Sequence, residues 1–298
     1  MISVCIPVYN YDACPLVQNL AAQAAALDAE VELVCIDDGS SAEWRQRNQP
    51  LQSMSHYVQL EENIGRARIR NLFLEHTTGE WLVFLDNDMV ISDGFLQRYV
   101  DTLKDKPAVV VGGVAYDHRY DDAEHRLRML YGHGVESRTA AERSSNPYRS
   151  FMTGNFMIHR DVLEQLRFDE RLHGYGHEDT LFGYHLEQHG VEVRHIDNPA
   201  VNGNVETNVQ FLRKTEEGVE NLATIFRFMS GEPGFTATVK LLRTYECLRK
   251  WHLTGAVGTI SRWLRRPLAR HLAGGRCISV RQLNFYKLGL FIEIINNK

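Results

Sequence analysis

Long apolar stretches and clustered cysteines are both missing from this chain of 298 residues. No segment approaches the roughly eighteen consecutive apolar residues of a membrane-spanning helix. Met1 leads straight into a strand pattern, without the basic and apolar regions of a signal peptide. The 5 cysteines form no Cys-x-x-Cys pair and no metal-ligand spacing, and Cys5 and Cys35 fall inside apolar strands. We therefore expect a cytoplasmic, reducing environment, no signal peptide and no transmembrane helix.

A positive net charge is also missing. The formal net charge is -5, which argues against nucleic-acid binding by the chain as a whole. The charge is unevenly spread, because residues 237–287 hold eleven Lys and Arg against a single acid, Glu246. No Gly-x-Gly-x-x-Gly motif follows the first expected strand, so a dinucleotide-binding fold has little support.

Apolar runs alternate with helical patterns along most of the chain. Runs that predict buried strands cover residues 2–8, 31–36, 56–60, 81–85, 108–114, 151–158 and 191–196. From residue 211 onward the pattern is mainly helical. This alternation predicts an α/β fold with a doubly wound, mostly parallel sheet, helices on both faces and a helical C-terminal extension. We expect one domain at residues 1–230, with halves at 1–115 and 116–230, and a basic helical region at 231–298.

The segment 81–88 is an apolar run that ends in Asp86, Asn87 and Asp88. Open α/β sheets place ligands at the carboxyl ends of their strands. Residues two apart in a strand point the same way, so Asp86 and Asp88 can aim both carboxylates at one Mg²⁺ or Mn²⁺ ion. The alternative is a polar strand end followed by a turn, and for an isolated pair it would be the better interpretation.

Two other segments carry residue types that suit a nucleotide. Asp38 can accept a hydrogen bond from the imide N–H of a uracil, and Tyr9 can cover the base. For the segment around Asp38 the alternative is a simple turn, since Asp and Gly are turn formers. Arg66, Arg68 and Arg70 begin a helix, where a phosphate binds well. Because a helix turns by about 100° per residue, at least one of the three should be solvated.

A glycine-rich segment precedes two acids at the start of a helix. Its residues are Gly174, Tyr175, Gly176, His177, Glu178 and Asp179. The glycines allow a tight turn that faces a ligand. A general base is one interpretation of the acids, and a plain acidic pair stabilised by the helix dipole is the other. Adjacent side chains diverge, so Glu178 and Asp179 should have separate roles.

Together these motifs resemble those of the family 2 inverting glycosyltransferases with the GT-A fold. The resemblance covers about residues 2–206 and rests on the order and spacing of four segments. They are Ile6-Pro7-Val8-Tyr9-Asn10, Ile36-Asp37-Asp38-Gly39-Ser40, Asn63-x-Gly65 with Arg70-Asn71, and Phe84-Leu85-Asp86-Asn87-Asp88. The glycine-rich segment is similar to the acceptor-side motif of galactosyl- and N-acetylgalactosaminyl-transferases and of chondroitin-polymerase-like domains.

The resemblance implies a metal-dependent inverting glycosyltransferase with a nucleotide-sugar donor, expected to be a UDP-sugar. It implies Mn²⁺ or Mg²⁺ as cofactor, a glycan or lipid-linked saccharide as acceptor, and Asp179 as the general base. The donor would bind in the 1–115 half and the acceptor in the 116–230 half. Residues implied for the donor are Pro7, Tyr9, Asn10, Asp38, Asn63, Gly65, Arg70, Asp86 and Asn87. Residues implied for the acceptor are Gly154, Asn155, Tyr175, Gly176 and Glu178.

One position departs from the family pattern. Related enzymes often carry a metal-binding His after an Asn-Pro segment, whereas residues 198–199 lead here to Asn202. Asn202 offers an oxygen beside Asp86 and Asp88, although Asn is weaker than His for Mn²⁺. His195 is the alternative third ligand. Two other functions stay open: a sugar nucleotidyltransferase, whose basic Gly-rich loop is missing, and a degenerate member that binds a sugar nucleotide without turnover.

The basic C-terminal region also has two interpretations. Trp251, Trp263, Leu264 and Leu268 are interleaved with its Lys and Arg residues. Basic amphipathic helices lie on anionic membrane surfaces, which predicts peripheral attachment to the inner face of the cytoplasmic membrane. The alternative is a solvated helix face that covers the acidic catalytic domain.

Overall fold

The computed structural model describes residues 1–172, 174–229 and 232–296. The chain forms two compact units. The first comprises Met1–Asp117, Glu136–Arg171 and Glu178–Asn204; the second comprises His118–Val135, Leu172–His177 and Val205–Lys298. The domain boundary expected between residues 230 and 231 lies outside the described residues, so that division stays a prediction.

A seven-stranded sheet forms the centre of the first unit. Its strands lie in the order β3 (His56–Gln59), β2 (Val31–Asp37), β1 (Ile2–Val8), β4 (Trp81–Leu85), β8 (Asn155–His159), β6 (Val109–Val111) and β9 (Val193–His195). All neighbours are parallel except β8, which is antiparallel to both β4 and β6. The predicted α/β fold with a mostly parallel sheet is therefore confirmed.

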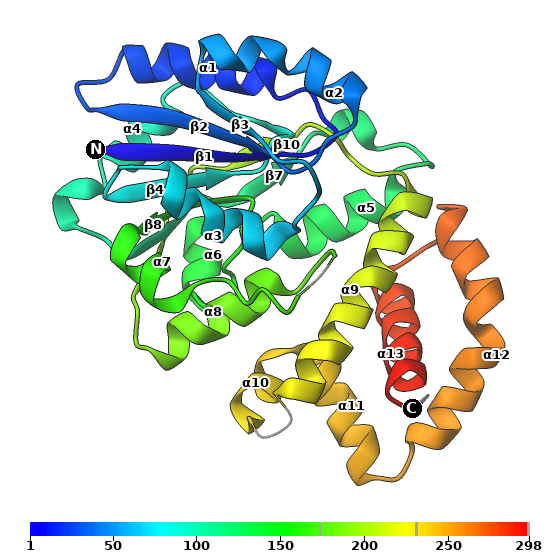
Figure 1. Ribbon diagram of the computed structural model, residues 1–298. Coiled ribbons are helices and arrows are strands. Elements are labelled where there is room, and N and C mark those ends of the chain that lie inside the picture. Colours follow the sequence, from blue (N-terminus) through cyan, green and yellow to red (C-terminus); the bar gives the residue numbers. More distant parts are fainter. Residues whose placement is uncertain (173, 230–231, 297–298) are drawn as a thin grey trace. The chain divides into compact units, whose positions relative to one another are not determined.

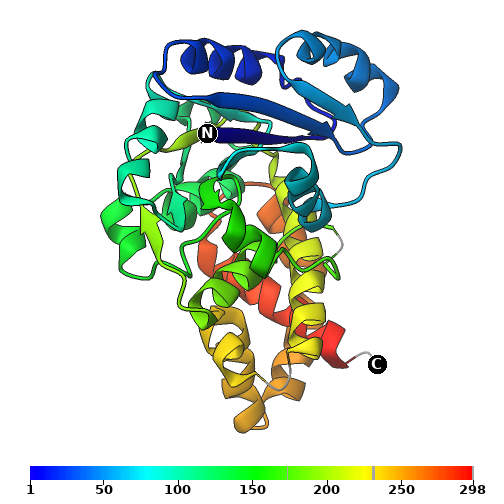
Figure 2. The ribbon, with the colours of Figure 1, turned by 60° about the vertical axis from the view of Figure 1, so that its left-hand side comes forward.

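Helices cover both faces of this sheet, which explains why its central strands are apolar throughout. Helix α1 (Cys14–Ala25) lies on one face with α4 (Phe95–Val100) packed against it. Helices α3 (Arg66–His76), α7 (Arg160–Leu166) and α8 (Glu178–Gln188) lie on the other face (Figures 1 and 2). There Phe73, Leu163 and Phe182 enclose Phe84 and Phe156 in one buried cluster.

A small second sheet belongs to the same unit. It consists of β5 (Met89–Val90), β10 (Ala200–Asn202) and β7 (Val114–Tyr116). The single strand expected at residues 108–114 is in fact two strands, β6 and β7, in different sheets. Gly112 and Gly113 separate them, and Gly113 has a φ of 90°, a left-handed value that breaks a strand. The result matters for the site, because β10 brings Asn202 opposite Met89, next to Asp88.

The second unit is helical, as the sequence predicts. Its main helices are α5 (Arg126–Tyr131), α9 (Asn208–Phe228), α10 (Pro233–Thr238), α11 (Lys240–Lys250), α12 (Thr254–Ala273) and α13 (Val280–Asn296). Leu127, Phe211, Leu272 and Leu283 share a buried core, and Figure 2 shows α9 beside α13. Within the described ranges no helix has both the length and the apolarity that crossing a membrane requires.

Candidate active site

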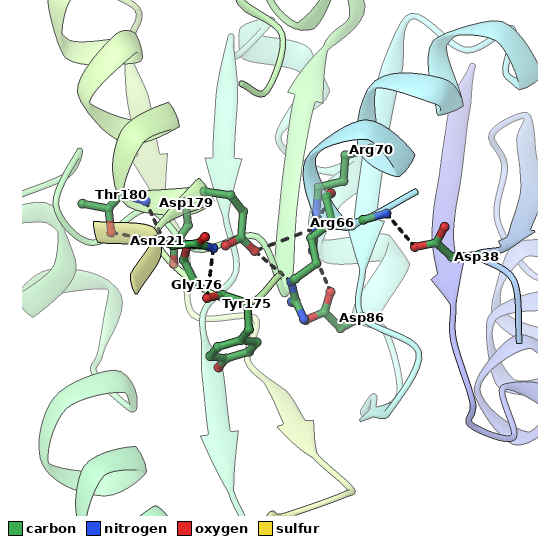
Figure 3. Close-up of polar contacts among 11 residues, drawn as sticks. Asp38, Arg66, Arg70, Asp86, Tyr175, Gly176, Asp179, Thr180 and Asn221 are labelled. Atoms are coloured by element: carbon green, nitrogen blue, oxygen red, sulfur yellow. Dashed lines mark hydrogen bonds and ion pairs between the residues drawn. The ribbon is translucent and has the colours of Figure 1, made fainter. Parts of the chain in front are cut away.

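A network of ion pairs lies at the carboxyl end of the central strand β4. Asp86 directly follows β4 and accepts hydrogen bonds from two arginines of α3: Arg66 Nη2 at 3.2 Å and Arg70 Nη2 at 2.9 Å (Figure 3). Arg66 Nε also donates to Glu178 Oε1 at 2.8 Å, at the start of α8. Three elements distant in sequence, β4, α3 and α8, therefore meet in one charged cluster at the carboxyl ends of the strands, where α/β folds bind ligands.

The helical period explains which arginines take part. Arg66 and Arg70 are four residues apart and share one face of α3. Arg70 is 1% exposed, whereas Arg68 is half exposed and pairs with Glu170, as expected for one solvated member of the three. The sequence offers Arg66 only as one of three arginines that suit a phosphate, and of these only Arg70 is among the residues implied for the donor. The i, i+4 spacing to Arg70 was the signal that could have found it.

The two acids at the start of α8 differ strongly in their acidity. Burial favours the neutral form of Glu178, but Arg66 and Arg70 outweigh this, and its pKa is lowered overall. Burial and the Glu178 carboxylate raise the pKa of Asp179 to about 7. Asp179 Oδ1 accepts hydrogen bonds from the backbone N–H of Thr180 at 2.6 Å and from its hydroxyl at 3.2 Å. An acid pair with divergent pKa values is a recurrent sign of acid–base chemistry.

A second group of polar residues lies at the carboxyl ends of β1 and β2, in the same unit. Asp38 Oδ1 accepts from the Ile64 N–H at 2.7 Å and Oδ2 from the Gly65 N–H at 3.3 Å, so it holds the turn that begins α3 (Figure 3). Burial raises the pKa of Asp38 despite these two bonds. The neighbouring Asp37 is fully buried and accepts from the Ser40 N–H at 2.7 Å and the Tyr57 hydroxyl at 3.0 Å.

Of the residues expected around the nucleotide base, two have exposed side chains. Tyr9 is 50% exposed, and Asn63 is also exposed. Asn10 Oδ1 accepts from the Ser41 N–H at 2.9 Å, which ties the end of β1 to the end of β2. Pro7 is partly buried within β1. These side chains lie where the sequence places the nucleotide, and their contact with it stays a prediction.

Two buried donors in the site have no hydrogen-bond partner among the described residues. They are Arg70 Nε and Asn87 Nδ2. A buried donor left unpaired costs about 1–3 kcal/mol, so such groups call for a partner from outside the protein, either water or a ligand. Both are N–H groups, which suit the oxygens of a phosphate or a sugar.

The expected cation ligands come from neighbouring strands. Asp88 and Asn202 are brought close by the pairing of β10 with β5, and the Gly203 N–H donates to the Asp88 backbone oxygen at 2.8 Å. His195, the alternative third ligand, lies in β9 with both ring nitrogens occupied. Nδ1 lies 3.1 Å from Arg143 Nε and Nε2 lies 3.0 Å from the Pro147 oxygen, which favours a structural role.

The two residues expected at the acceptor, Gly154 just before β8 and Asn155 at its start, differ in their environment. The Gly154 backbone oxygen accepts from the Asp86 N–H at 3.1 Å, and a Cβ at Gly154 would lie 3.3 Å from Asp86 Oδ2. Asn155 is fully buried, and its amide is bonded to the oxygens of Gly113 and Asn198 and to the Tyr99 hydroxyl. These bonds favour a structural role for Asn155.

The glycine-rich segment before Glu178 is ordered within the second unit. Asn221 of α9 donates to the backbone oxygens of Tyr175 at 3.1 Å and Gly176 at 3.2 Å (Figure 3). Gly176 has a φ of 97°, and a Cβ there would lie 3.1 Å from Gly218 Cα. Only glycine fits this turn without strain.

The family follows from comparison with known sequences. Residues 3–167 match the model of glycosyl transferase family 2, which is more than half of the chain. The chain belongs to glycosyl transferase family 2. It is 26% identical to an uncharacterized glycosyltransferase, YfnE, of Bacillus subtilis over 62% of this chain and 49% of that protein. It is 26% identical to an uncharacterized glycosyltransferase of Haemophilus influenzae over 61% of this chain and 70% of that protein.

Another curated relative matches over a smaller share of its length. The succinoglycan biosynthesis protein ExoM of Rhizobium meliloti is 32% identical over 40% of this chain and 38% of that protein. The chain thus spans about half or less of the length of several curated relatives.

Solved structures support the GT-A fold. A mannosyltransferase from Pyrobaculum calidifontis, in complex with GDP-Man and Mn²⁺, has a TM-score of 0.54 and 19% identity, covering 99% of this chain and 85% of that one. Glucosyl-3-phosphoglycerate synthase from Mycobacterium tuberculosis, in complex with Mn²⁺, UDP and glucosyl-3-phosphoglycerate, has a TM-score of 0.51 and 20% identity, covering 76% and 79%. At these identities the likeness concerns the fold alone.

Proposed function

We propose that this family 2 member is a metal-dependent inverting glycosyltransferase that moves a sugar from a UDP-sugar to a hydroxyl of a glycan or a lipid-linked saccharide. One observation carries the proposal: Asp86, two arginines and Glu178 form a single network at the end of β4, directly beside an aspartate whose pKa is about 7. This arrangement combines groups that suit a charged donor with a group that can take a proton.

The donor would lie along the ends of β1, β2 and β4. Each Asp38 oxygen uses one lone pair on the α3 turn and has a second for the imide N–H of a uracil. The exposed Tyr9 would stack on the base, with Pro7, Asn10, Asn63 and Gly65 around it. Arg70 Nε and Asn87 Nδ2, the unpaired donors, would meet oxygens of the ribose and diphosphate.

The residues present fit a hard divalent cation. Asp86, Asp88 and Asn202 supply only oxygen ligands, the set that Mg²⁺ and Mn²⁺ prefer. Both Asp86 oxygens accept from arginines and Asn202 Oδ1 accepts from the Asn204 N–H at 3.0 Å, so these oxygens would use their second lone pairs for the ion. When bound, Mn²⁺ or Mg²⁺ supplies Lewis-acid stabilisation of the departing diphosphate.

Asp179 would act as the general base. Its pKa near 7 matches a proton acceptor that works at neutral pH. Thr180 holds one of its oxygens, which orients the carboxylate. The acceptor hydroxyl would give its proton to Asp179 while its oxygen attacks the anomeric carbon on the face opposite the diphosphate, through an oxocarbenium-like transition state.

The acceptor would contact Glu178 and the segment before it. Tyr175 and Gly176 stand three and two residues before Glu178 in the chain, and Asn221 holds their backbone. Gly154, which lies against Asp86, would border the transferred sugar. The similarity of the glycine-rich segment to galactosyl- and N-acetylgalactosaminyl-transferases makes a galactose-type sugar the first donor to try.

A panel of sugar nucleotides tests the proposal. We expect thermal stabilisation by a UDP-sugar in the presence of Mn²⁺, and release of UDP when an acceptor saccharide is added. Release of pyrophosphate from a nucleoside triphosphate and a sugar phosphate would indicate a nucleotidyltransferase instead. Binding without turnover in every combination would indicate a degenerate member, and stabilisation by no sugar nucleotide would refute the donor site.

Helix α12 supports a membrane-bound acceptor. Ile260 and Trp263 are 54% and 89% exposed and share one helix face with Leu264, while Arg262 and Arg266 on the same helix are also exposed. An apolar stripe flanked by arginines suits an anionic lipid surface. The occupant we propose is therefore the anionic leaflet that would carry a lipid-linked acceptor.

Sedimentation with vesicles tests this surface. The full chain should co-sediment with vesicles rich in phosphatidylglycerol at low salt, and the double variant Ile260→Ser with Trp263→Ser should not. Val209→Ser removes an apolar side chain that is 65% exposed on α9 and serves as the control. Equal sedimentation of all three proteins, or of none, would leave α12 as a solvated helix face.

A further inference from the structure

Three side chains of the second unit gather at a place that the proposed reaction does not use. His118 lies in a 3-10 turn (η3, His118–Tyr120), Asp121 follows it, and His133 lies in a π-helical turn (η4, Gly132–Glu136) after α5. One ligand atom from each lies within 4.8 Å of the ligand atoms of the other two. We propose that His118, Asp121 and His133 bind a Zn²⁺ ion.

The local backbone explains why the three meet. In a 3-10 turn the side chains at i and i+3 lie on the same side. The Asp121 N–H donates to the His118 oxygen at 3.1 Å, and His118 Nδ1 lies 2.9 Å from Asp121 Oδ2. The His133 ring stacks on the His118 ring, with centroids 4.8 Å apart and planes inclined by 13°. The chain that leaves His118 therefore comes back to it after α5, at His133.

The donor set selects a metal different from that of the proposed sugar-nucleotide site. Two imidazoles and one carboxylate suit Zn²⁺, whereas the Asp86, Asp88 and Asn202 oxygens suit Mg²⁺ and Mn²⁺. In a tetrahedral zinc site the ligand atoms lie roughly 3.3 Å apart. His118 and Asp121 are 81% and 52% exposed, so their side chains have room to rotate over the remaining distance.

The surroundings leave a coordination position open. A hollow of about 680 Å³ adjoins the cluster and has Asp121, Arg126, His133 and Cys277 in its wall. Three protein ligands with one open position is the arrangement in which zinc keeps a water molecule. The ion would connect residues 118–121 to residue 133 and so close the segment around α5.

A second pair in the same segment provides a matched control. His125 Nδ1 lies 2.9 Å from both carboxylate oxygens of Asp122, with the same i, i+3 spacing. Among the described residues, no third ligand joins this pair. His125→Ala therefore removes a histidine of the same segment and the same pairing without touching the proposed site.

Calorimetric titration of ZnCl₂ into the full chain, with saturating Mg²⁺ to fill the oxygen site, tests the proposal. The wild type and His125→Ala should bind one Zn²⁺ with equal affinity. His118→Ala should weaken binding by at least about tenfold, because even partners one step removed from a metal are worth about 10–100-fold. Zn²⁺ should also raise the Tm of the first two proteins more than that of His118→Ala.

Three results would overturn the proposal. The first is that the wild type takes up no Zn²⁺, which would leave His118 and Asp121 as an ordinary ion pair. The second is that His118→Ala and His125→Ala weaken binding equally, which would indicate adventitious surface histidines. The third is that binding survives His118→Ala but is lost in Cys277→Ser, which would assign the metal to the exposed thiol at the wall of the hollow.

Discussion

The pH dependence of turnover can be worked out from the two acids that begin α8. The pKa of Asp179 is raised to about 7, first by burial and then by the Glu178 carboxylate. A base acts in its ionised form, and a pKa of 7 leaves about one-tenth of Asp179 ionised at pH 6 and about nine-tenths at pH 8. We expect kcat/KM to rise roughly tenfold between these two pH values and to level off above them.

Glu178→Gln perturbs this pKa in a known direction. The substitution removes the negative charge beside Asp179 and leaves Arg66, whose charge already lowers the pKa of Asp179, with one carboxylate partner fewer, since its bond to Asp86 stays. Both effects lower the pKa of Asp179. A charge in contact range shifts a pKa by about 1–3 units, so the acid limb of the profile should move by at least about one unit to lower pH. The KM for the acceptor should rise more than kcat falls.

Asp179→Asn separates the loss of the base from a loss of folding. Removal of a general base costs about 10²–10⁴-fold in kcat, while affinity for the sugar nucleotide should stay near wild type. Because the folded-state pKa of Asp179 is raised, the folded protein loses stability as pH rises from the usual aspartate range through 7. Asn cannot ionise, so the Tm of this variant at pH 8 should equal or exceed that of the wild type.

The assay is the initial rate of UDP release from pH 5.5 to 9, with donor and acceptor taken from the substrate panel. Asp161→Asn, which removes an acid 84% exposed at the start of α7, serves as the control and should keep the wild-type profile. A general-base role for Asp179 is refuted if Glu178→Gln leaves the profile in place or if Asp179→Asn keeps near-normal kcat. A dead Glu178→Gln beside an active Asp179→Asn would exchange the two roles.

Three further predictions concern the cation, the buried arginine and the β2 turn. Asp88→Ala should abolish turnover without lowering the Tm, and excess EDTA should do the same to the wild type; full activity in EDTA would contradict a metal requirement. Arg70→Met should lower the urea-measured free energy of unfolding by about 3 kcal/mol, the low end for a broken buried pair, because Asp86 keeps Arg66 as a partner. Arg68→Met at an exposed pair should cost about 1 kcal/mol or less, and equal losses would refute the importance of burial. Gly39→Ala should lower the Tm more than Gly65→Ala. Both glycines have positive φ, but a Cβ at Gly39 would lie 2.4 Å from the Glu62 carbonyl carbon, whereas a Cβ at Gly65 would have no atom within 4 Å. A smaller loss at Gly39 would contradict the packing of this turn.

The sequence by itself determined the architecture and the end of the sheet that carries the chemistry. Apolar runs with a strand-like length mark β1, β2 and β4, and the alternation with helical periods predicts the α/β class correctly. Asp86 and Asp88 follow directly after the most apolar strand, so their place at its carboxyl end could be stated without coordinates. These features depend on neighbouring residues only, which is why a local pattern suffices.

Only the tertiary structure decided which polar groups act on one another. The bond from Arg66 to Glu178 joins residues 112 positions apart, and no periodicity indicates it. The pKa of Asp179 depends on burial and on charges from other elements. Asn155, implied by the resemblance as an acceptor contact, and His195, the alternative metal ligand, are each bonded within the protein. Electrostatic fields and hydrogen-bond saturation depend on side chains brought together by folding, because burial removes the water that would otherwise screen or satisfy them.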